Sequence, residues 1–366
     1  MEDFQLLIKP AGPDCNARCV YCFYRRVSEM FPGDSHRMSR KVVEKMIADY
    51  LSLQFPVSVF SWQGGEPTLC GLDFFQEVVK LQMKYSRKGQ RVSNTFQTNG
   101  FLLNGEWCRF FNKYFFFVGI SIDGPEKIHD FYRGKGSWKK AMKAVNLLKE
   151  YKVEFNVLSV LTRKSEGKAR EIFNFFLDNG IRYLQFIPCL EKEEKRIAPY
   201  SITPEGYGNF LIELFDLWWK ERERVSIRLF DSLLEKLITG ENKSFCPLSS
   251  TCGNYVVVEH NGSVYPCDFF VRKEWLLGNI MERNLVEIYE SPKKKRFNLN
   301  KRFLSPECEE CPYQEFCYGG CQKDRIDEKG NPSAKTYFCV SYRMFFSHAL
   351  PRLKRYALEI SRKSRK

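Results

Sequence analysis

Short apolar segments alternate with amphipathic stretches over about the first 190 residues of the chain. The apolar segments are rich in β-branched and aromatic residues, which is typical of buried strands. They are LLIK, VSVFSW, VSNTFQ, FFFVGISI, EFNVLSV and YLQFIP. The stretches between them have helical periodicity, so the pattern predicts parallel βα units. We expect an α/β fold built as a partial (β/α)6 TIM-like barrel; a flat doubly wound sheet has the same local pattern.

A different pattern follows the barrel. A further helix begins at Thr203 as N-cap with Pro204 as its first residue. Eight cysteines and many turn residues then lie between Cys246 and Cys339, with a hairpin turning at Asn261-Gly262. The end of the chain predicts a closing helix interrupted near Pro351. We therefore expect four regions: a barrel at 1–225, a helical linker at 226–245, a small cysteine-rich domain at 246–345, and a C-terminal helix with a basic tail at 346–366.

Composition narrows the class of protein. The net charge of +14 is spread along the chain and indicates a solvated basic surface that in part offsets bound anions; it does not favour a nucleic-acid partner. No apolar run is long enough to span a bilayer, and the first residues, MEDFQLLIKP, lack a signal-type segment. We expect a cytoplasmic protein with no membrane partner. In that compartment, 14 cysteines indicate metal ligation and not a disulfide framework.

Three cysteines follow the first predicted strand. Cys15, Cys19 and Cys22 have the spacing C-x3-C-x2-C and lie in one short loop, where a parallel βα fold places its ligands. A four-iron cluster normally has four cysteine ligands, so three leave one iron open to bind a substrate. A zinc site short of one ligand is the alternative.

A second motif, Gly64-Gly65-Glu66-Pro67, follows the second predicted strand. Its glycines allow close approach of the backbone to a ligand, and the Glu66 carboxylate can accept hydrogen bonds from an amine. With these two motifs the chain resembles the radical S-adenosylmethionine superfamily. The resemblance implies that S-adenosylmethionine binds the open iron and yields a 5′-deoxyadenosyl radical that abstracts hydrogen from a substrate.

The eight later cysteines are enough for two complete sets of four. Five of them read C-x2-C-x5-C-x3-C-x17-C, and two iron–sulfur clusters or two zinc sites fit the count. The whole series resembles the SPASM extension, which carries two auxiliary [4Fe–4S] clusters and brings the expected total to three. The resemblance implies one ligand set of Cys246, Cys252, Cys267 and Cys321 and another of Cys308, Cys311, Cys317 and Cys339.

Asp268 directly follows Cys267, where a carboxylate could act as a general base or cap the backbone. The whole chain is similar to anaerobic sulfatase-maturating enzymes, in the segments LLIKP, FYRR, QGGEPTL, LQFIPCL and GSVYPCDFF. That resemblance makes Asp268 the base in the oxidation of a Ser or Cys side chain to formylglycine, with hydrogen abstraction from Cβ and electron transfer to an auxiliary cluster. It also makes Gln63 a substrate contact and implies S-adenosylmethionine contacts at Tyr21, Gly65, Ser121, Arg133 and Leu190.

The same resemblance implies the partners. They are an unfolded or nascent sulfatase peptide and a low-potential electron donor such as flavodoxin or ferredoxin, and we expect a monomer. The nearest alternative is another SPASM peptide maturase that forms a thioether or other side-chain crosslink. Many of these carry an N-terminal recognition domain, for which the first strand, near Phe4, leaves no room. A non-catalytic electron carrier or a zinc-stabilised binding module is the more distant alternative.

Overall fold

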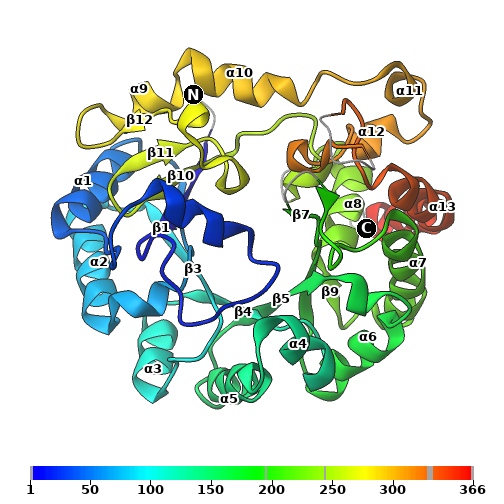
Figure 1. Ribbon diagram of the computed structural model, residues 1–366, viewed down its shortest axis with the longest axis horizontal. Helices are drawn as coiled ribbons and strands as arrows, with labels where there is room; N and C mark the ends of the chain where they lie inside the picture. Colours follow the sequence, from blue (N-terminus) through cyan, green and yellow to red (C-terminus); the bar gives the residue numbers. More distant parts are fainter. Residues whose placement is uncertain (1–2, 194–195, 243–244, 328–332, 364–366) are drawn as a thin grey trace. The chain divides into compact units, whose positions relative to one another are not determined.

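The computed structural model describes residues 3–193, 196–242, 245–327 and 333–363 (Figure 1). Part of the loop after Cys189 (194–195) and the last residues of the predicted basic tail (364–366) therefore lie outside the described residues. The chain forms two compact units. The first comprises Met1–Ser121, Tyr132–Phe155 and Gly253–Asn298. The second comprises Ile122–Phe131, Asn156–Cys252 and Leu299–Lys366.

Parallel strands form the centre of the first unit. In it β1 pairs with β2, β2 with β3 and β3 with β4, all in parallel. The strands of this series are β1 (Gln5–Lys9), β2 (Val57–Trp62), β3 (Arg91–Thr98) and β4 (Phe117–Ser121). The helices between and after them are η1 (Phe23–Met30), α1 (Arg40–Leu51), η2 (Pro67–Cys70), α2 (Leu72–Tyr85), α3 (Gly105–Lys113) and α5 (Ser137–Glu150).

Local sequence explains where these helices begin. The Ser39 side chain accepts a hydrogen bond from the Val42 amide at the start of α1, and the Asn104 side chain caps α3 in the same way. Along β2 every second side chain is buried, which is the period of a strand with one face against the core. The predicted strand–helix alternation is confirmed in this unit.

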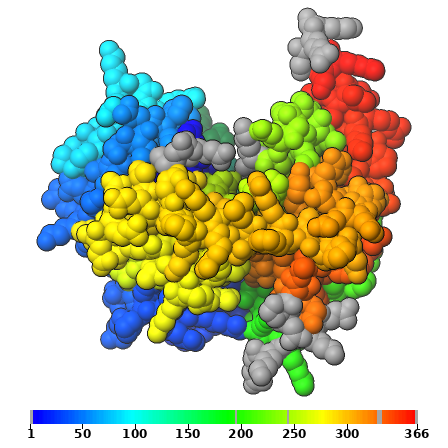
Figure 2. Space-filling view, turned by 90° about the horizontal axis from the view of Figure 1, so that it is seen from above, coloured from blue at the N-terminus to red at the C-terminus, as the bar shows by residue number. Residues whose placement is uncertain are grey.

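A late segment of the chain returns to the first unit. Strand β10 (Tyr255–Glu259) pairs in parallel with β1, with Gln5 opposite Tyr255 and Lys9 opposite Glu259. The hairpin at Asn261-Gly262 is confirmed, because β11 (Ser263–Tyr265) pairs antiparallel with β10 and Gly262 has φ +85°. Figure 2 shows this segment in yellow on the face seen there. Its other elements are η5 (Asp268–Phe270), η6 (Lys273–Trp275), β12 (Gly278–Asn279), α9 (Leu285–Tyr289) and α10 (Pro292–Asn300).

The second unit also contains parallel strands with helices. Strand β5 pairs with β6, and β6 with β9. The parallel strands are β5 (Phe155–Leu161), β6 (Tyr183–Pro188) and β9 (Ser226–Ile227). Strands β7 (Lys192–Glu193) and β8 (Arg196–Ile197) form a separate antiparallel pair. The longer helices are α6 (Ala169–Asp178), α7 (Pro204–Glu221), α8 (Arg228–Thr239) and α13 (Cys339–Lys363), while α4 (Glu126–Arg133) crosses from this unit to the first.

The predicted interruption near Pro351 is wrong, because α13 runs as one helix through it. Proline removes one helical hydrogen bond but does not always end a helix. Here α13 packs along α7 and α8: Phe345 stacks on Phe230 with ring centroids 5.5 Å apart, and Arg352 lies over Phe215 at 4.6 Å. Packing on both sides of Pro351 keeps the axis continuous.

The rest of the second unit is made of short elements around the later cysteines. They are η3 (Arg163–Ser165), η4 (Cys246–Leu248), α11 (Pro306–Glu309), α12 (Gln314–Cys317) and η7 (Gln322–Asp324). None of the described helices has both the length and the apolar character needed to cross a bilayer.

Candidate functional site

The loop after β1 brings three cysteines together. The Cys22 amide donates to the Cys19 carbonyl at 3.2 Å, and the Ala17 amide donates to the Cys15 sulfur at 3.3 Å. Burial raises the pKa of the Cys15 thiol to about 12, and charge on the Cys19 and Cys22 thiols acts in the same direction. The three sulfur atoms therefore lie within electrostatic reach of one another, as ligands of one cluster must.

The Gly-Gly-Glu-Pro loop lies directly against this cysteine loop. The Gly65 amide donates to the Gly12 carbonyl at 2.9 Å, and the Glu66 amide donates to the Asp14 carbonyl at 2.7 Å. A Cβ atom on Gly65 would lie 1.9 Å from the Asp14 carbonyl oxygen. Glycine is required at position 65 because the two backbones are this close.

Glu66 is fully buried and joins the two loops to β3. One oxygen accepts from the Thr68 amide at 3.0 Å and from the hydroxyls of Thr68 and Thr98, and the other accepts from the Asn99 amide at 2.8 Å. Burial raises the pKa of Glu66, and these hydrogen bonds oppose the rise. The Asn99 side chain in turn donates to the Cys15 sulfur at 3.7 Å. Glu66 thus holds the loops in place, while its contact with an amine stays a prediction.

Asp14 holds the other side of the cysteine loop. Its carboxylate accepts from the His36 amide at 2.8 Å, lies 2.7 Å from His36 Nδ1, and accepts from the Arg37 guanidinium. Burial alone would raise the pKa of Asp14, but the hydrogen bonds from His36 and Arg37 lower it below 3.8. The side chain is therefore held as a carboxylate next to the first ligand cysteine.

The other predicted cofactor and substrate contacts lie at strand ends or in this loop. The Arg133 guanidinium lies over the Tyr21 ring at 5.4 Å, and Ser121 Oγ accepts from Gln97 at 3.0 Å. The Gln63 amide donates to the Ile8 carbonyl at 2.9 Å, directly after β2. These residues, with Gly65 and Glu66, belong to the first unit, whereas Leu190 is buried in the second unit just past β6.

Asp268 belongs to the first unit and begins η5 directly after Cys267. The Tyr255 hydroxyl donates to Asp268 Oδ1 at 3.2 Å and lies 3.1 Å from the Cys267 sulfur. Lys9, whose side chain is 1% exposed, places its ammonium 3.9 Å from Asp268 Oδ2. The buried ammonium of Lys9 thus lies directly beside the Asp268 carboxylate.

A buried cluster connects Asp268 to the cysteine loop. The Phe23 ring, next to Cys22, packs on the Phe269 ring with centroids 4.4 Å apart. Beneath them Tyr24 packs with Val257, Tyr265 and other apolar side chains, and its hydroxyl donates to the buried Glu259. Burial, with help from Glu259, raises the pKa of Tyr24 well above 10.0. The predicted base and the cysteine loop thus form one packed assembly.

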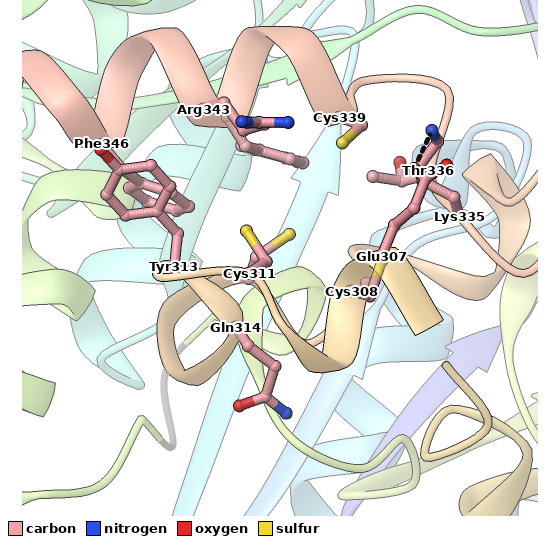
Figure 3. A pocket seen from close by; sticks show the side chains of 13 residues that line it. Glu307, Cys308, Cys311, Tyr313, Gln314, Lys335, Thr336, Cys339, Arg343 and Phe346 are labelled. Carbon is pink, nitrogen blue, oxygen red and sulfur yellow. Dashed lines mark hydrogen bonds and ion pairs between the residues drawn. The ribbon is translucent and has the colours of Figure 1, made fainter. Parts of the chain in front are cut away.

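One predicted ligand set surrounds a pocket in the second unit. Cys308, Cys311, Cys317 and Cys339 all line it (Figure 3). Figure 3 shows Cys339 at the start of α13, facing Cys311 and Cys308 on the chain below. Burial, and then charge on Cys339 and Cys308, raises the pKa of Cys317 to about 12. At the rim Lys335 pairs with Glu307 at 2.6 Å.

The other predicted set has three of its cysteines in the second unit. Burial raises the pKa of Cys321 well above 9.0. Charge on Asp324 raises this pKa further, and charge on Cys246 and Cys252 contributes in the same direction. Cys267 belongs to the first unit, so its membership of this set rests on the resemblance.

The donor atoms fit iron–sulfur clusters. Four cysteines of one predicted set, Cys308, Cys311, Cys317 and Cys339, line one pocket. Four cysteine thiolates are the usual ligands of a four-iron cluster. Within the described ranges, no group of three His, Cys, Asp or Glu side chains is placed to hold a single metal ion.

Several residues of this assembly escaped the sequence analysis. Lys9, Tyr24 and Tyr255 contact the predicted base or its surroundings, and His36 holds Asp14. A polar residue at the end of an otherwise apolar strand, as Lys9 is, could have indicated a site. The contacts of Tyr24 and Tyr255 depend on the pairing of β1 with β10, which no local pattern reveals.

Models of known protein families match both the earlier and the later part of the chain. A family model described as the radical SAM superfamily matches residues 10–176, and a model described as an iron-sulfur cluster-binding domain matches residues 246–312. A cysteine-type anaerobic sulfatase-maturating enzyme from Clostridium perfringens is 40% identical over 363 residues, covering 96% of this chain and 98% of the relative. A serine-type enzyme from Bacteroides thetaiotaomicron is 37% identical, covering 94% and 89%.

A solved structure matches at the level of the fold. Native anSMEcpe with bound AdoMet is 40% identical and superimposes with a TM-score of 0.90, over 96% of this chain and 99% of that one. The same protein with bound AdoMet and the Cp18Cys peptide gives the same TM-score at 39% identity. The expected mixed α/β fold, a partial TIM-like barrel followed by a cysteine-rich domain and a C-terminal helix, is confirmed by this match.

Proposed function

The chain belongs to the family of anaerobic sulfatase-maturating enzymes, and from this premise we propose that it oxidises a Ser or Cys side chain of a sulfatase peptide to formylglycine. The observation that carries the proposal is the position of Asp268. It is 3.9 Å from Lys9 at the end of β1 and is joined through Phe269 and Phe23 to the cysteine loop. A base next to the radical-forming loop is what the oxidation requires.

Three [4Fe–4S] clusters are proposed, held by the cysteine loop and by the two later sets. Bound S-adenosylmethionine and the clusters together supply the removal of one hydrogen atom from the substrate Cβ and of one electron from the carbon radical that remains. Tyr21, Gly65, Ser121, Arg133 and Leu190 are proposed to bind S-adenosylmethionine, and Gln63 to contact the peptide. A low-potential donor such as flavodoxin or ferredoxin is proposed as the source of electrons.

Asp268 completes the balance of the reaction. It takes the proton of the substrate OH or SH as the electron leaves, so that a carbon–oxygen or carbon–sulfur double bond forms. A serine then gives formylglycine directly, and a cysteine gives a thioaldehyde that water hydrolyses with loss of hydrogen sulfide. Lys9 places a positive charge beside the carboxylate, and Tyr255 orients it through the hydrogen bond that its hydroxyl donates to Oδ1.

A peptide assay tests the proposal. We expect the reconstituted enzyme to introduce a hydrazine-reactive aldehyde into a peptide with Cys or Ser, Pro or Ala two residues later, and Arg two residues after that. Asp268→Asn should still form 5′-deoxyadenosine but lose aldehyde formation by about 10²–10⁴-fold, the usual contribution of a general base. The exposed Glu274 is the matched control, and Glu274→Gln should behave as the unmodified protein does.

Two results would count against the proposal. Full aldehyde formation by Asp268→Asn would remove Asp268 from the reaction. A peptide that loses two hydrogens without gaining an aldehyde would favour the crosslinking maturase. The domain boundaries, the monomeric state and the cytoplasmic location stay predictions.

A further inference from the structure

Two buried cations lie among the cysteines of the second unit. Lys301, directly after α10, is 1% exposed, and Arg325, directly after η7, is 9% exposed. Burying a cation is costly unless it is paired with an anion or well hydrogen-bonded. The groups around these two side chains therefore indicate the role of their positive charges.

The groups that bind both cations are neutral. The Lys301 ammonium donates to the carbonyls of Cys246 at 2.7 Å and Pro247 at 3.0 Å. Among the described residues, the Arg325 guanidinium donates to backbone carbonyls, those of Lys301, Phe303, Tyr318, Gly319 and, at 3.5 Å, Asn300. Across the described part of the chain, neither forms an ion pair with a carboxylate. Two positive charges are thus held in place without a fixed negative charge.

The potential anions near these cations are cysteine thiols. Lys301 donates to the carbonyl of Cys246, a residue of the first predicted ligand set. Arg325 donates to the carbonyls of Tyr318 and Gly319, which lie between Cys317 of the second set and Cys321 of the first. Lys301 therefore lies at the first set, and Arg325 lies where the two sets meet in the sequence.

We propose that Lys301 and Arg325 are positioning residues that raise the reduction potentials of the two auxiliary clusters. This rests on the proposed function, which assigns the surrounding cysteines as ligands. Adding an electron to a thiolate-bound cluster makes it more negative, and a fixed cation in a weakly polar interior stabilises that state more than the oxidised one. The charges thereby favour the uptake of the electron that leaves the substrate radical as Asp268 takes its proton.

The test measures potentials without substrate. The full chain is reconstituted with Cys15→Ala, Cys19→Ala and Cys22→Ala, so that only the auxiliary clusters contribute to the electron paramagnetic resonance signal during a redox titration. Lys301→Gln and Arg325→Gln keep an amide that can donate to the same carbonyls but remove the charge. We expect each to lower the equilibrium constant for reduction at least tenfold, which is about 59 mV for a one-electron couple.

Matched variants separate charge from structure. Arg302 is the exposed neighbour of Lys301, and Arg302→Gln should leave both potentials unchanged. Lys301→Arg and Arg325→Lys keep the charge, so both reduction potentials should stay close to those of the chain without these substitutions. With Lys301→Gln, the lower potential should belong to one cluster, whereas Arg325→Gln should lower both.

Each outcome decides the proposal. Unchanged potentials at full iron content in both Gln variants would overturn it. Loss of iron in both Gln variants and also in the charge-preserving pair, or potentials that fall as far in the charge-preserving pair as in the Gln variants, would assign the two residues a structural role and also overturn it. Failure of the proposed function is distinguishable, because then the unmodified enzyme makes no aldehyde while the potentials still shift.

Discussion

The cysteine loop of the first unit and the cysteine pocket of the second unit are built in opposite ways. In the loop, three thiols follow one strand, and backbone bonds to Gly65 and Glu66 and side-chain bonds from Asp14 and Asn99 fix its shape. In the pocket, the thiols come from helices of four residues, α11 and α12, from Cys311 between them, and from the first residue of α13. We therefore expect protein contacts to shape the loop without a cluster, and the pocket to need a bound cluster to hold such short elements together.

The largest expected difference between the two sites, in stability, comes from removing one cysteine from the loop and one from the pocket. Cys19→Ala should abolish 5′-deoxyadenosine formation and lower the iron content from about 12 to about 8 per chain, since each cluster holds four irons, with little change in the unfolding midpoint. Cys317→Ala should lose about as much iron but also unfold at markedly lower denaturant, while it still cleaves S-adenosylmethionine. Iron analysis and anaerobic unfolding measure both effects.

Cys108 is the control for these two variants. It is buried in α3 and belongs to neither ligand set, so Cys108→Ala should keep about 12 irons and full cleavage. If Cys19→Ala destabilised the chain as much as Cys317→Ala, the two sites would not differ in the way described.

A smaller effect is expected from disturbing the backbone contact of the loop. Gly65→Ala would place a Cβ 1.9 Å from the Asp14 carbonyl oxygen, so the two loops must separate. We expect a loss of about 1–3 kcal/mol in the free energy of unfolding, typical of overpacking, and weaker binding of S-adenosylmethionine by equilibrium dialysis. Gly71→Ala is the control: nothing lies within 4 Å of its Cβ, although φ there is +80°. It should keep the affinity.

The smallest effects are expected from the carboxylates that flank each site. Asp14→Asn should cost about 0.5–1.5 kcal/mol, because it weakens the hydrogen bonds that Asp14 accepts from His36 and Arg37 but keeps one acceptor oxygen. Glu307→Gln removes a solvent-exposed pair with Lys335 and should barely change the unfolding midpoint. Both pKa values are lowered in the folded protein, from 3.8 and 4.5.

The pH dependence of these two variants has a definite sign. A lowered pKa means that the carboxylate stabilises the fold fully above its ordinary pKa and loses this contribution as the pH falls through the folded value. The difference between Asp14→Asn and the unmodified protein should therefore be constant at neutral pH and shrink below about pH 4. Denaturant unfolding over this range checks the sign, and a difference that grew on acidification would contradict the assignment of Asp14.

The sequence was sufficient to predict the elements whose cause is local. The strands, the capped start of α7 at Thr203 and the turn at Asn261-Gly262 all follow from neighbouring residues. The predicted interruption at Pro351 is wrong because local chemistry favours a break in the helix there. The aromatic contacts of α13 with α7 and α8, which oppose the break, come from distant residues.

The residues of the site likewise fall into two groups, those that a local motif predicts and those that depend on tertiary packing. The cysteine series and Gly65 could be found as motifs, because their chemistry needs particular residue types at particular spacings. Lys301 and Arg325 could not, because a chain with 58 Lys and Arg residues gives no sign of which are buried. Their burial depends on tertiary packing. The role of Asp268 needed the resemblance, since one carboxylate after one cysteine has many uses.

The parallel pairing of β1 with β10 has a consequence for synthesis. Gln5 and Lys9 lie opposite Tyr255 and Glu259, so one neighbour of the first strand is among the later parts of the chain to leave the ribosome. At 5–20 residues per second, translation of the intervening segment takes roughly 10–50 s. The three thiols after β1 emerge early, while Val257, Tyr265 and Val271, which pack around Tyr24 beside them, emerge much later. During that interval the nascent loop is incomplete and open to oxidants, so cluster insertion is best timed after these residues have emerged.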